Sequence, residues 1–583
     1  MVPKIITLIA AGSLFCVGCL EAETTSQPDA GSLLLQQRPR PAQVQELLKP
    51  DSQPGQVEVL PKPDAAKPQP PVKDDGIRVT VKAFKFVGFE GVASEGELQS
   101  LVAGSLGKSL SFGDLEAIAQ KITSYLKRHG WLLADVYIPA QDVTSGVIVI
   151  KISPGKGVGA PSIKRDTSVR ISEKPLRRIA EHSYQSGFPL NERDIERSVL
   201  LMNDLPGITA KSSLSPGIES GTSRLEYFVK EESLLSGLFW VDNQGNRYTG
   251  SWEENANLLV NDPFRQGDQF SFTIKRSEGL VQGDIGYRFP LFVYPGLTGT
   301  LNFTGMHYKL LEELAALHYG GNSYIIDAGL SYPIVRSRKS NLTTSVNYDH
   351  KKLIDNVASK DIRDRAINRV TFSVRGDYQD ALLLGGYTSW NIGVTTGKLH
   401  ESIKDISLTK TEGGYTRFNL MLSRLQSLTE SVSFDLSLTS QIAMNNLDSS
   451  EKFFLGGPNS VRAYPLGEAP GDHGGLINAD IRYRIPAPAK LGALQLSMFY
   501  DAGHVTLNKE RYPQDVVTAT NRNDYWLQGA GLGIRDDISK QFVVQGSWAH
   551  VIGDNPGRNA TNGTNSDGMK DKSRFWLQGL MYF

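Results

Sequence analysis

Apolar and polar residues alternate with a period of two along residues 233–583 of the chain. Phe270, Phe272 and Ile274 lie on one side of such a segment, and Ser271 and Thr273 lie on the other. Strands of soluble sandwiches usually have about five or six residues. The segments here run to about ten residues, the length that a tilted strand needs to cross a bilayer. The pattern therefore predicts a transmembrane antiparallel β-barrel.

Sixteen segments carry this alternation, and their soft boundaries leave fourteen or eighteen strands open as well. A sheet inside hydrocarbon has to close on itself, because no water is present to satisfy its N–H and C=O groups. An even number of strands puts both chain ends on the same side of the membrane. The segments begin near residues 234, 251, 268, 279, 297, 322, 340, 368, 387, 413, 430, 474, 493, 526, 541 and 573.

The last segment ends at Phe583 and has Trp576, Leu580 and Tyr582 on one face. Aromatic side chains are enriched where a membrane protein meets the lipid interface. We therefore expect Phe583 to lie at the interface, at the terminus that closes the barrel. The alternative is an ordinary buried C-terminal strand.

Residues 77–232 have a different pattern, in which strand and helix periods follow one another. A strand with Phe84 and Phe86 precedes a helix capped by Ser94, with Glu97 three residues later. A second helix begins at Asp114, and two strands follow, so the order is β-α-α-β-β. The same order returns after Pro161. We therefore predict two copies of one α+β module, at residues 77–155 and 156–232.

The first 76 residues combine three compositions. Lys4, an apolar run over residues 5–20 and a small residue at Ala22 are typical of an export signal, residues 1–22, cleaved after Ala22. A lipoprotein modified at Cys19 is the alternative. Residues 23–49 contain a short amphipathic helix or, on the alternative reading, a disordered tail. Seven prolines between residues 50 and 71 make residues 50–76 an extended linker.

Composition excludes several kinds of function. The 62 Lys and Arg residues cancel the 62 Asp and Glu residues, so no overall positive charge attracts nucleic acid. The two cysteines, Cys16 and Cys19, both lie in the export signal and cannot build a zinc site.

Enzyme motifs are missing as well. Gly107-Lys108-Ser109 lacks the first glycine of a phosphate loop, because residue 102 is Val102. The glycines of residues 529–533 lie in a predicted strand without dinucleotide-binding spacing. No HExxH or GxSxG motif is present. We therefore assign no catalytic, cofactor-binding or metal-binding residue and expect neither an enzyme nor a cofactor.

Several motifs resemble one known family, the two-partner secretion transporters (TpsB, hemolysin-activator type) of the BamA-like outer-membrane superfamily. The resemblance covers nearly the whole mature chain. Residues 137–142 and 146–150 are similar to the closing strands of this family's first POTRA domain, and residues 261–263 and 331–336 are similar to barrel motifs. The most specific motif is Val461-Arg462-Ala463-Tyr464, which is similar to the VRGY/F motif at the tip of the long sixth loop. Ala463 stands where the family usually has Gly, so a tip conformation that depends on Gly is in question.

The resemblance implies that this loop folds back into the barrel lumen. It also implies that Arg462 meets an acidic residue of a strand motif that resembles F-x-D-x-G, here Phe499, Asp501 and Gly503. Alternation supports the pairing, because the face that carries Asp501 is less apolar than the face with Met498 and should point inward. A charge that faces lipid costs about 2 to 4 kcal/mol at mid-depth for a base and somewhat less for an acid.

The resemblance implies a protein translocator in the outer membrane of a Gram-negative bacterium. Its two POTRA domains, in the periplasm, would capture a secreted TpsA-type adhesin or hemolysin, and its 16-stranded barrel would export that protein. The family further implies a helix that plugs the pore, within residues 23–49. The expected partners are outer-membrane lipid and the barrel-assembly machinery for insertion, and the expected state is a monomer. A BamA-like insertase that assembles other barrels is the runner-up, and a passive porin does not explain the tandem modules.

Overall fold

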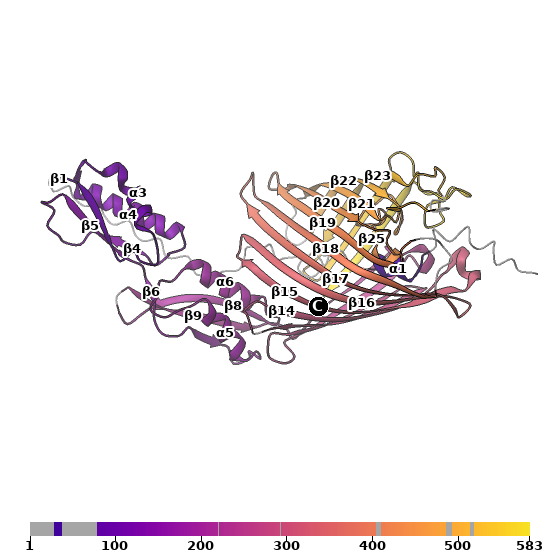
Figure 1. Ribbon diagram of the computed structural model, residues 1–583, viewed down its shortest axis with the longest axis horizontal. Helices are drawn as coiled ribbons and strands as arrows, with labels where there is room; N and C mark the ends of the chain where they lie inside the picture. Colours follow the sequence, from indigo (N-terminus) through magenta and orange to yellow (C-terminus); the bar gives the residue numbers. More distant parts are fainter. Residues whose placement is uncertain are drawn as a thin grey trace, which may run out of the picture.

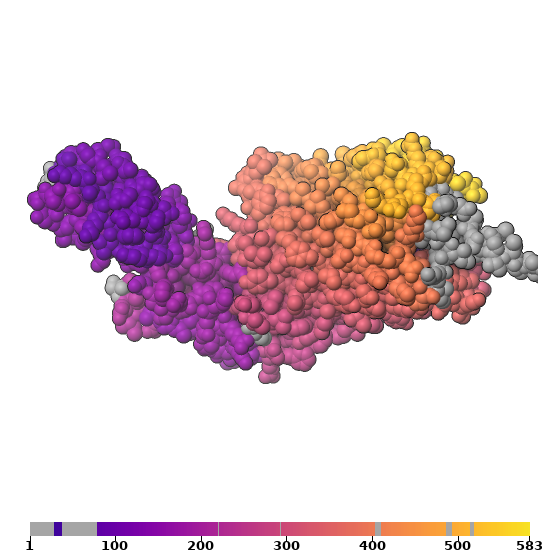
Figure 2. Space-filling model, in the orientation of Figure 1, coloured from indigo at the N-terminus to yellow at the C-terminus, as the bar shows by residue number. Residues whose placement is uncertain are grey.

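A computed structural model describes residues 28–37, 78–219, 221–291, 293–403, 410–485, 492–512 and 518–583. The predicted export signal, residues 1–22, and the predicted linker, residues 50–76, lie outside the described residues. Figures 1 and 2 show an elongated molecule with a large barrel and two small modules that project from one end of it.

The first module forms a three-stranded sheet covered by two helices. Strand β5 (Val147–Ser153) lies in the centre, parallel to β2 (Ala83–Val87) and antiparallel to β4 (Asp135–Tyr137). The predicted capping box holds α3 (Glu95–Val102), and α4 (Phe112–Arg128) begins two residues before the predicted Asp114 because Ser111 is its N-cap. β1 (Arg78–Thr80) pairs with β3 (Ser109–Ser111), and a 3₁₀ turn η2 (Ala103–Ser105) follows α3.

The second module repeats this topology. Strand β9 (Thr222–Glu231) lies parallel to β7 (Ser162–Arg165) and antiparallel to β8 (Ile208–Pro216), as β5 does with β2 and β4. The short β6 (Lys156–Gly157) pairs with the start of β9. Helices α5 (Glu173–His182) and α6 (Glu192–Asn203) cover the sheet. The repeat expected from the sequence is therefore present in the order and the direction of the strands.

The remaining strands form one closed barrel of sixteen, which confirms the predicted count. Each strand is antiparallel to the next, and β10 closes the ring by pairing with β25. The strands are β10 (Leu235–Asp242), β11 (Glu253–Asn261), β12 (Gln269–Arg276), β13 (Leu280–Pro290), β14 (Thr298–Lys309), β15 (Tyr319–Arg336), β16 (Ser340–Val357), β17 (Lys360–Asp380), β18 (Gly386–Ile403), β19 (Gly413–Ser427), β20 (Val432–Ala443), β21 (His473–Arg484), β22 (Ala493–Thr506), β23 (Asp524–Asp537), β24 (Phe542–Val551) and β25 (Ser573–Tyr582). Short 3₁₀ turns are η3 (Arg247–Thr249), η4 (Glu312–Leu317) and η5 (Ser449–Glu451).

The largest error in the predicted strand starts concerns β17, which begins at Lys360 and not near residue 368. Residues 360–367 carry charged side chains on both faces, so no alternation marks them as a strand. They pair with β16 nevertheless. The other described starts lie within three residues of their predicted positions.

The two faces of β25 have different surroundings. Trp576 and Leu580 belong to the face that points into the barrel and are buried, whereas Phe583 belongs to the opposite face and is 58% exposed. Phe583 and Gly237 exchange two backbone hydrogen bonds of 3.0 and 3.1 Å, which extend the seam between β10 and β25. No helix in the described part of the chain is long and apolar enough to cross a membrane.

The second module is attached to the short turns at the near end of the barrel. The Arg336 guanidinium donates to both carboxylate oxygens of Asp204, at 2.7 and 2.9 Å. Arg338 pairs with Glu192 and Glu196 of α6. Arg197 donates to the carbonyl oxygen of Pro333 at 2.8 Å. Helix α6 is thus fixed to the turn between β15 and β16, and the long connections lie at the opposite end.

Replacing Arg336 and Arg338 together by alanine should loosen this attachment. The pairs are partly exposed, so we expect a loss of about 1 kcal/mol for each, and amide exchange in α6 should become roughly tenfold faster or more. Hydrogen-exchange mass spectrometry of the purified chain measures this. Arg177→Ala, which removes an exposed ion pair with Glu173 on α5, is the matched control. Unchanged exchange in α6 would contradict an attachment that depends on these arginines.

Candidate functional site

The connection between β20 and β21, residues 444–472, folds back into the barrel, and we call it the lumen loop. Val461, Ala463 and Tyr464 are fully buried at its tip. They pack in one apolar cluster with inward-facing wall residues, among them Phe499 and Leu527. The wall supplies these contacts because alternate residues of β22, β23 and β24 point inward.

Arg462 is bound to two carboxylates of the barrel wall. Its Nη2 donates to Asp501 Oδ1 at 2.6 Å, and its Nε donates to Asp501 Oδ2 at 2.8 Å. Its Nη1 and Nη2 donate to the two oxygens of Asp480, at 2.9 and 3.1 Å. The ion pair between Arg462 and Asp501 expected from the sequence is present, and Asp480 of the neighbouring strand β21 adds a second one.

Further contacts hold this arginine in one orientation. Its guanidinium lies 3.4 Å from the centre of the Phe499 ring. Asn478 donates to Asp501 Oδ1 at 2.7 Å and to the carbonyl oxygen of Ser460 at 2.8 Å, so it joins the loop to the wall. Trp576 Nε1 donates to the carbonyl oxygen of Arg462 at 2.8 Å. A guanidinium with two bidentate partners is among the strongest polar contacts that a protein makes.

The structure answers the question raised by Ala463. Its φ angle is not in the left-handed region, so the tip needs no glycine at this position. Space is limited on the opposite wall, where a Cβ added to Gly529 would lie 2.6 Å from the Cβ of Ala463. Gly503 is also close to the loop, because a Cβ there would lie 2.3 Å from Leu455. Glycines of the wall therefore make room for the loop.

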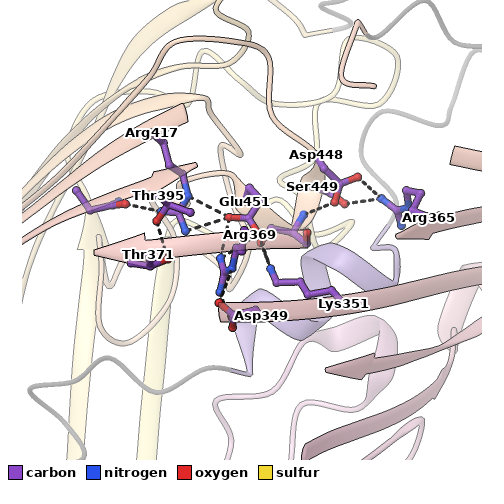
Figure 3. Close-up of polar contacts among 12 residues, drawn as sticks. Asp349, Lys351, Arg365, Arg369, Thr371, Thr395, Arg417, Asp448, Ser449 and Glu451 are labelled. Carbon is purple, nitrogen blue, oxygen red and sulfur yellow. Dashed lines mark hydrogen bonds and ion pairs between the residues drawn. The ribbon is translucent and has the colours of Figure 1, made fainter. Parts of the chain in front are cut away.

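A second set of ion pairs holds the loop near its start, as Figure 3 shows. Glu451 is fully buried and accepts from Lys351 at 2.5 Å, from Arg369 at 2.9 Å and from Arg417 at 3.0 Å. Arg369 also pairs with Asp349 at 3.0 Å. Burial alone would raise the pKa of the Glu451 carboxyl, but the three cations lower it well below its usual value. This cluster joins β16, β17 and β19 to the loop.

Helix α1 (Ala30–Gln36) lies inside the barrel, beside β15, β16 and η5, as Figure 1 shows. It is shorter than the predicted helical segment; residues 38–49 of that segment lie outside the described residues. Leu33 and Leu34 are buried against lumen residues such as Leu353 and Leu447. Gln37 donates to Glu253 at 2.8 Å.

Asp29, the N-cap of α1, pairs with wall cations. It lies 3.0 Å from Arg365 and 3.3 Å from Arg363. Burial alone would raise its pKa, but these two arginines hold it below the usual value. Arg365 is fully buried and also pairs with Asp448 of the lumen loop at 2.6 Å and with Asp355 of β16 at 2.7 Å. One guanidinium thus contacts the helix, the loop and the wall.

Two polar cavities lie beside the ion pairs of Glu451 and Arg369, on the side that faces the modules. One has a volume of about 380 Å³ and the other about 200 Å³, and Arg369 and Thr371 line both. The remaining lining residues are mostly Asn, Thr, Asp and Ser. The lumen is therefore filled by the loop and α1 toward the far end and is open and polar toward the modules.

Sequence reasoning missed most of these lumen contacts. It identified Arg462 and Asp501, but not Asp480, Glu451 or Arg365. The available signal was the charge on the inward face of β17, where Arg363, Arg365 and Arg369 occupy three of four alternate positions. Among the residues that the structure describes, no group of His, Cys, Asp or Glu could hold a metal ion.

A bulky residue at Gly529 should displace the tip of the loop. Gly529→Leu would put side-chain atoms where Ala463 now lies, so amide exchange over residues 460–465 should rise sharply in the purified protein. Gly579→Leu is the matched control, because nothing lies within 4 Å of a Cβ added at this position of β25. Equal protection of residues 460–465 in both variants would show that the tip does not depend on this contact.

Comparison with known proteins identifies the family. The family model "Haemolysin secretion/activation protein ShlB/FhaC/HecB" matches residues 221–535, more than half of the chain, and "POTRA domain, ShlB-type" matches residues 79–155. The heme/hemopexin transporter protein HuxB of Haemophilus influenzae (strain 86-028NP) is 27% identical over 499 residues, 84% of each chain. The outer membrane transporter CdiB of Dickeya dadantii (strain 3937) is 21% identical over 462 residues, 77% of this chain and 79% of that one.

Solved structures share the fold. CdiB from Escherichia coli matches with a TM-score of 0.71 and 18% identity, over 89% of this chain and 93% of that chain. CdiB from Acinetobacter baumannii matches with a TM-score of 0.64 and 17% identity, over 93% and 96%. The chain belongs to the ShlB/FhaC/HecB family of haemolysin secretion and activation proteins, outer-membrane transporters whose POTRA domains lie in the periplasm.

Proposed function

We propose that this transporter exports a secreted partner of the TpsA type, an adhesin or hemolysin, through its own barrel. The observation that carries the proposal is the filling of the lumen by two separate segments, α1 and the lumen loop. Both are held there by ion pairs as well as by apolar contacts. The ion pairs can exchange for water and for polar groups of a passing chain, so a closed barrel of this kind can open without loss of its wall.

The periplasmic modules would bind the partner as an extended chain. Strands β2 and β4 each pair only with β5 among the described strands, and β7 and β8 pair only with β9, so both sheets have free edges. A free edge can accept an added strand through backbone hydrogen bonds, which tolerate many sequences. We propose this mode of capture for the partner before it enters the barrel.

The open part of the lumen suits an unfolded chain. The larger cavity is lined by side chains such as Asn302, Thr304 and Asn347, which offer hydrogen bonds without a large apolar surface. A chain in transit would exchange hydrogen-bond partners there, and no single position would bind it strongly. Folding of the partner outside the cell would then make export irreversible. We further propose that the transporter acts as a monomer and enters the membrane through the barrel-assembly machinery.

Arg462→Ala should reduce export of the partner to less than about a tenth while the barrel still assembles. The substitution leaves Asp480 and Asp501 without their cation, and removing one member of a buried pair costs about 3 to 5 kcal/mol, less where water reaches the pair. Partner protein in the medium, at equal outer-membrane abundance of the transporter, is the measurement. The matched control is Arg482→Ala, which removes an inward ion pair with Asp435 between strands β21 and β20 of the wall. Export by Arg462→Ala at the control's level would refute the role of the loop.

The same assay separates this function from barrel assembly. Depletion of a translocator stops the appearance of one secreted protein outside the cell, and other outer-membrane barrels keep their abundance. Depletion of an insertase lowers the abundance of many barrels. General loss of barrels would refute the proposal.

Displacing α1 should open the pore. Leu33→Gln together with Leu34→Gln places polar groups in the apolar contacts that hold the helix, and deletion of residues 28–37 removes the helix altogether. We expect both variants to raise single-channel conductance severalfold in planar bilayers. Leu35→Gln, on a partly exposed position of the same helix, is the control. If conductance stays at the wild-type level in both variants, α1 is not a plug.

A further inference from the structure

The histidines of the barrel are concentrated at its extracellular rim. The chain has nine histidines, and the seven beyond residue 233 all lie in the extracellular halves of strands or in the loops between them. Five of these occupy outward positions in β14, β16, β18, β22 and β24. They are His307, His350, His400, His504 and His550.

Alternation within each strand shows that these side chains point outward. In β14, Leu301 and Phe303 are 50% and 45% exposed, whereas Met306 and Tyr308 are buried in the lumen. His307 shares the face of Leu301 and Phe303. In β24, Trp548 and His550 likewise share the outward face, and their rings lie 6.1 Å apart. These histidines therefore lie at the extracellular side of the apolar band that faces lipid.

Three lysines continue the same row. Lys309, Lys352 and Lys398 occupy outward positions of β14, β16 and β18, within two residues of His307, His350 and His400. Strand register places His350 and Lys398 level with each other, on either side of Asn368 of β17. We call these eight residues, the five histidines and three lysines, the outer rim belt.

The periplasmic rim of the outward face has a different composition. Its outward positions in the described strands carry no histidine or lysine, although aromatic side chains such as Tyr287, Phe289 and Trp390 lie there, as others do at the outer rim. The ion pair between Arg424 and Asp380 also lies there, and it adds no net charge to this rim. A general preference for interfacial residues would apply to both rims. The asymmetry therefore points to a feature of the outer leaflet.

The belt has an excess of positive charge. Lys352 pairs with Asp364, and His400 lies 3.9 Å from Glu412. Within the described part of the chain, neither Lys309 nor Lys398 forms an ion pair, and both are exposed. His307 and His350 contact only the amide oxygens of Asn322 and Asn368, at 2.9 and 2.8 Å. Ammonium groups and imidazole N–H donors beside an apolar surface suit a phosphate group attached to acyl chains.

We propose that the outer rim belt binds the phosphate groups of a phosphorylated glycolipid in the outer leaflet. Acyl chains of this lipid contact the apolar band below the belt, and its phosphates lie between the lysines and histidines. The site is separate from the lumen, so it does not depend on the proposed route of export. Phosphate in solution lacks the acyl chains and does not occupy it.

The experiment uses the purified full chain in detergent micelles. Its unfolding midpoint, followed by the heat-dependent shift in gel mobility, is measured with bisphosphorylated lipid A, with the same lipid lacking phosphate, and with inorganic phosphate. We expect bisphosphorylated lipid A to raise the midpoint and the other two to leave it nearly unchanged. A lysine near a membrane surface contributes about 1 kcal/mol to anionic lipid binding, so Lys309→Gln with Lys398→Gln should weaken the affinity roughly thirtyfold.

Lys85→Gln with Lys108→Gln in the first POTRA domain is the matched control, because both side chains are exposed and far from the barrel. This variant should respond to lipid A as the wild type does. Equal stabilisation by the lipid without phosphate would overturn the proposal, and so would an unchanged response of Lys309→Gln with Lys398→Gln. Stabilisation by inorganic phosphate alone would show a free-anion site instead. If the belt variant fails to assemble, comparing the two lipids on the wild type still decides whether the phosphate groups contribute to binding.

Discussion

Closure of the backbone hydrogen-bond network between β10 and β25 is the constraint from which the rest of this structure follows. A sheet in hydrocarbon cannot leave an edge unpaired, so the strands form a ring. A ring of sixteen is too wide for wall side chains alone to fill. The space is occupied by α1 and by the lumen loop, so the lumen of this wide barrel is filled from within.

Ion pairs fill much of the lumen, beside the two apolar clusters that pack against α1 and the loop tip. Glu451 meets three cations, and Arg462 meets two carboxylates. A well-packed apolar core of similar volume would often be equally stable or more stable. It would also expose a large apolar surface whenever the loop moved. Charged contacts fix one closed arrangement and leave a hydrophilic surface after they separate, which suits the proposed opening of the pore.

Sequence alone predicted the parts of this molecule that depend on local pattern. Alternation placed nearly every strand, and it oriented Asp501 correctly because one face of β22 is clearly more apolar. It failed at the start of β17, where both faces are charged, and it could not find Asp480. The pairing of Arg462 with Asp480 depends on which residues of β21 and β22 are neighbours and on how far the loop reaches inward. Both properties arise from tertiary structure and leave no local signal.

The contacts of Arg365 suggest how the two filling segments depend on each other. Asp29 of α1, Asp448 of the loop and Asp355 of the wall surround this one buried guanidinium. The two segments also touch directly, because Ser449 Oγ of the loop donates to Asp29 at 2.7 Å and α1 packs against η5, so departure of either segment removes contacts that hold the other. Release of the helix therefore lowers the free energy required to release the loop, and the reverse also holds because such coupling is reciprocal. Closed and open lumen are then favoured over states in which only one segment has left.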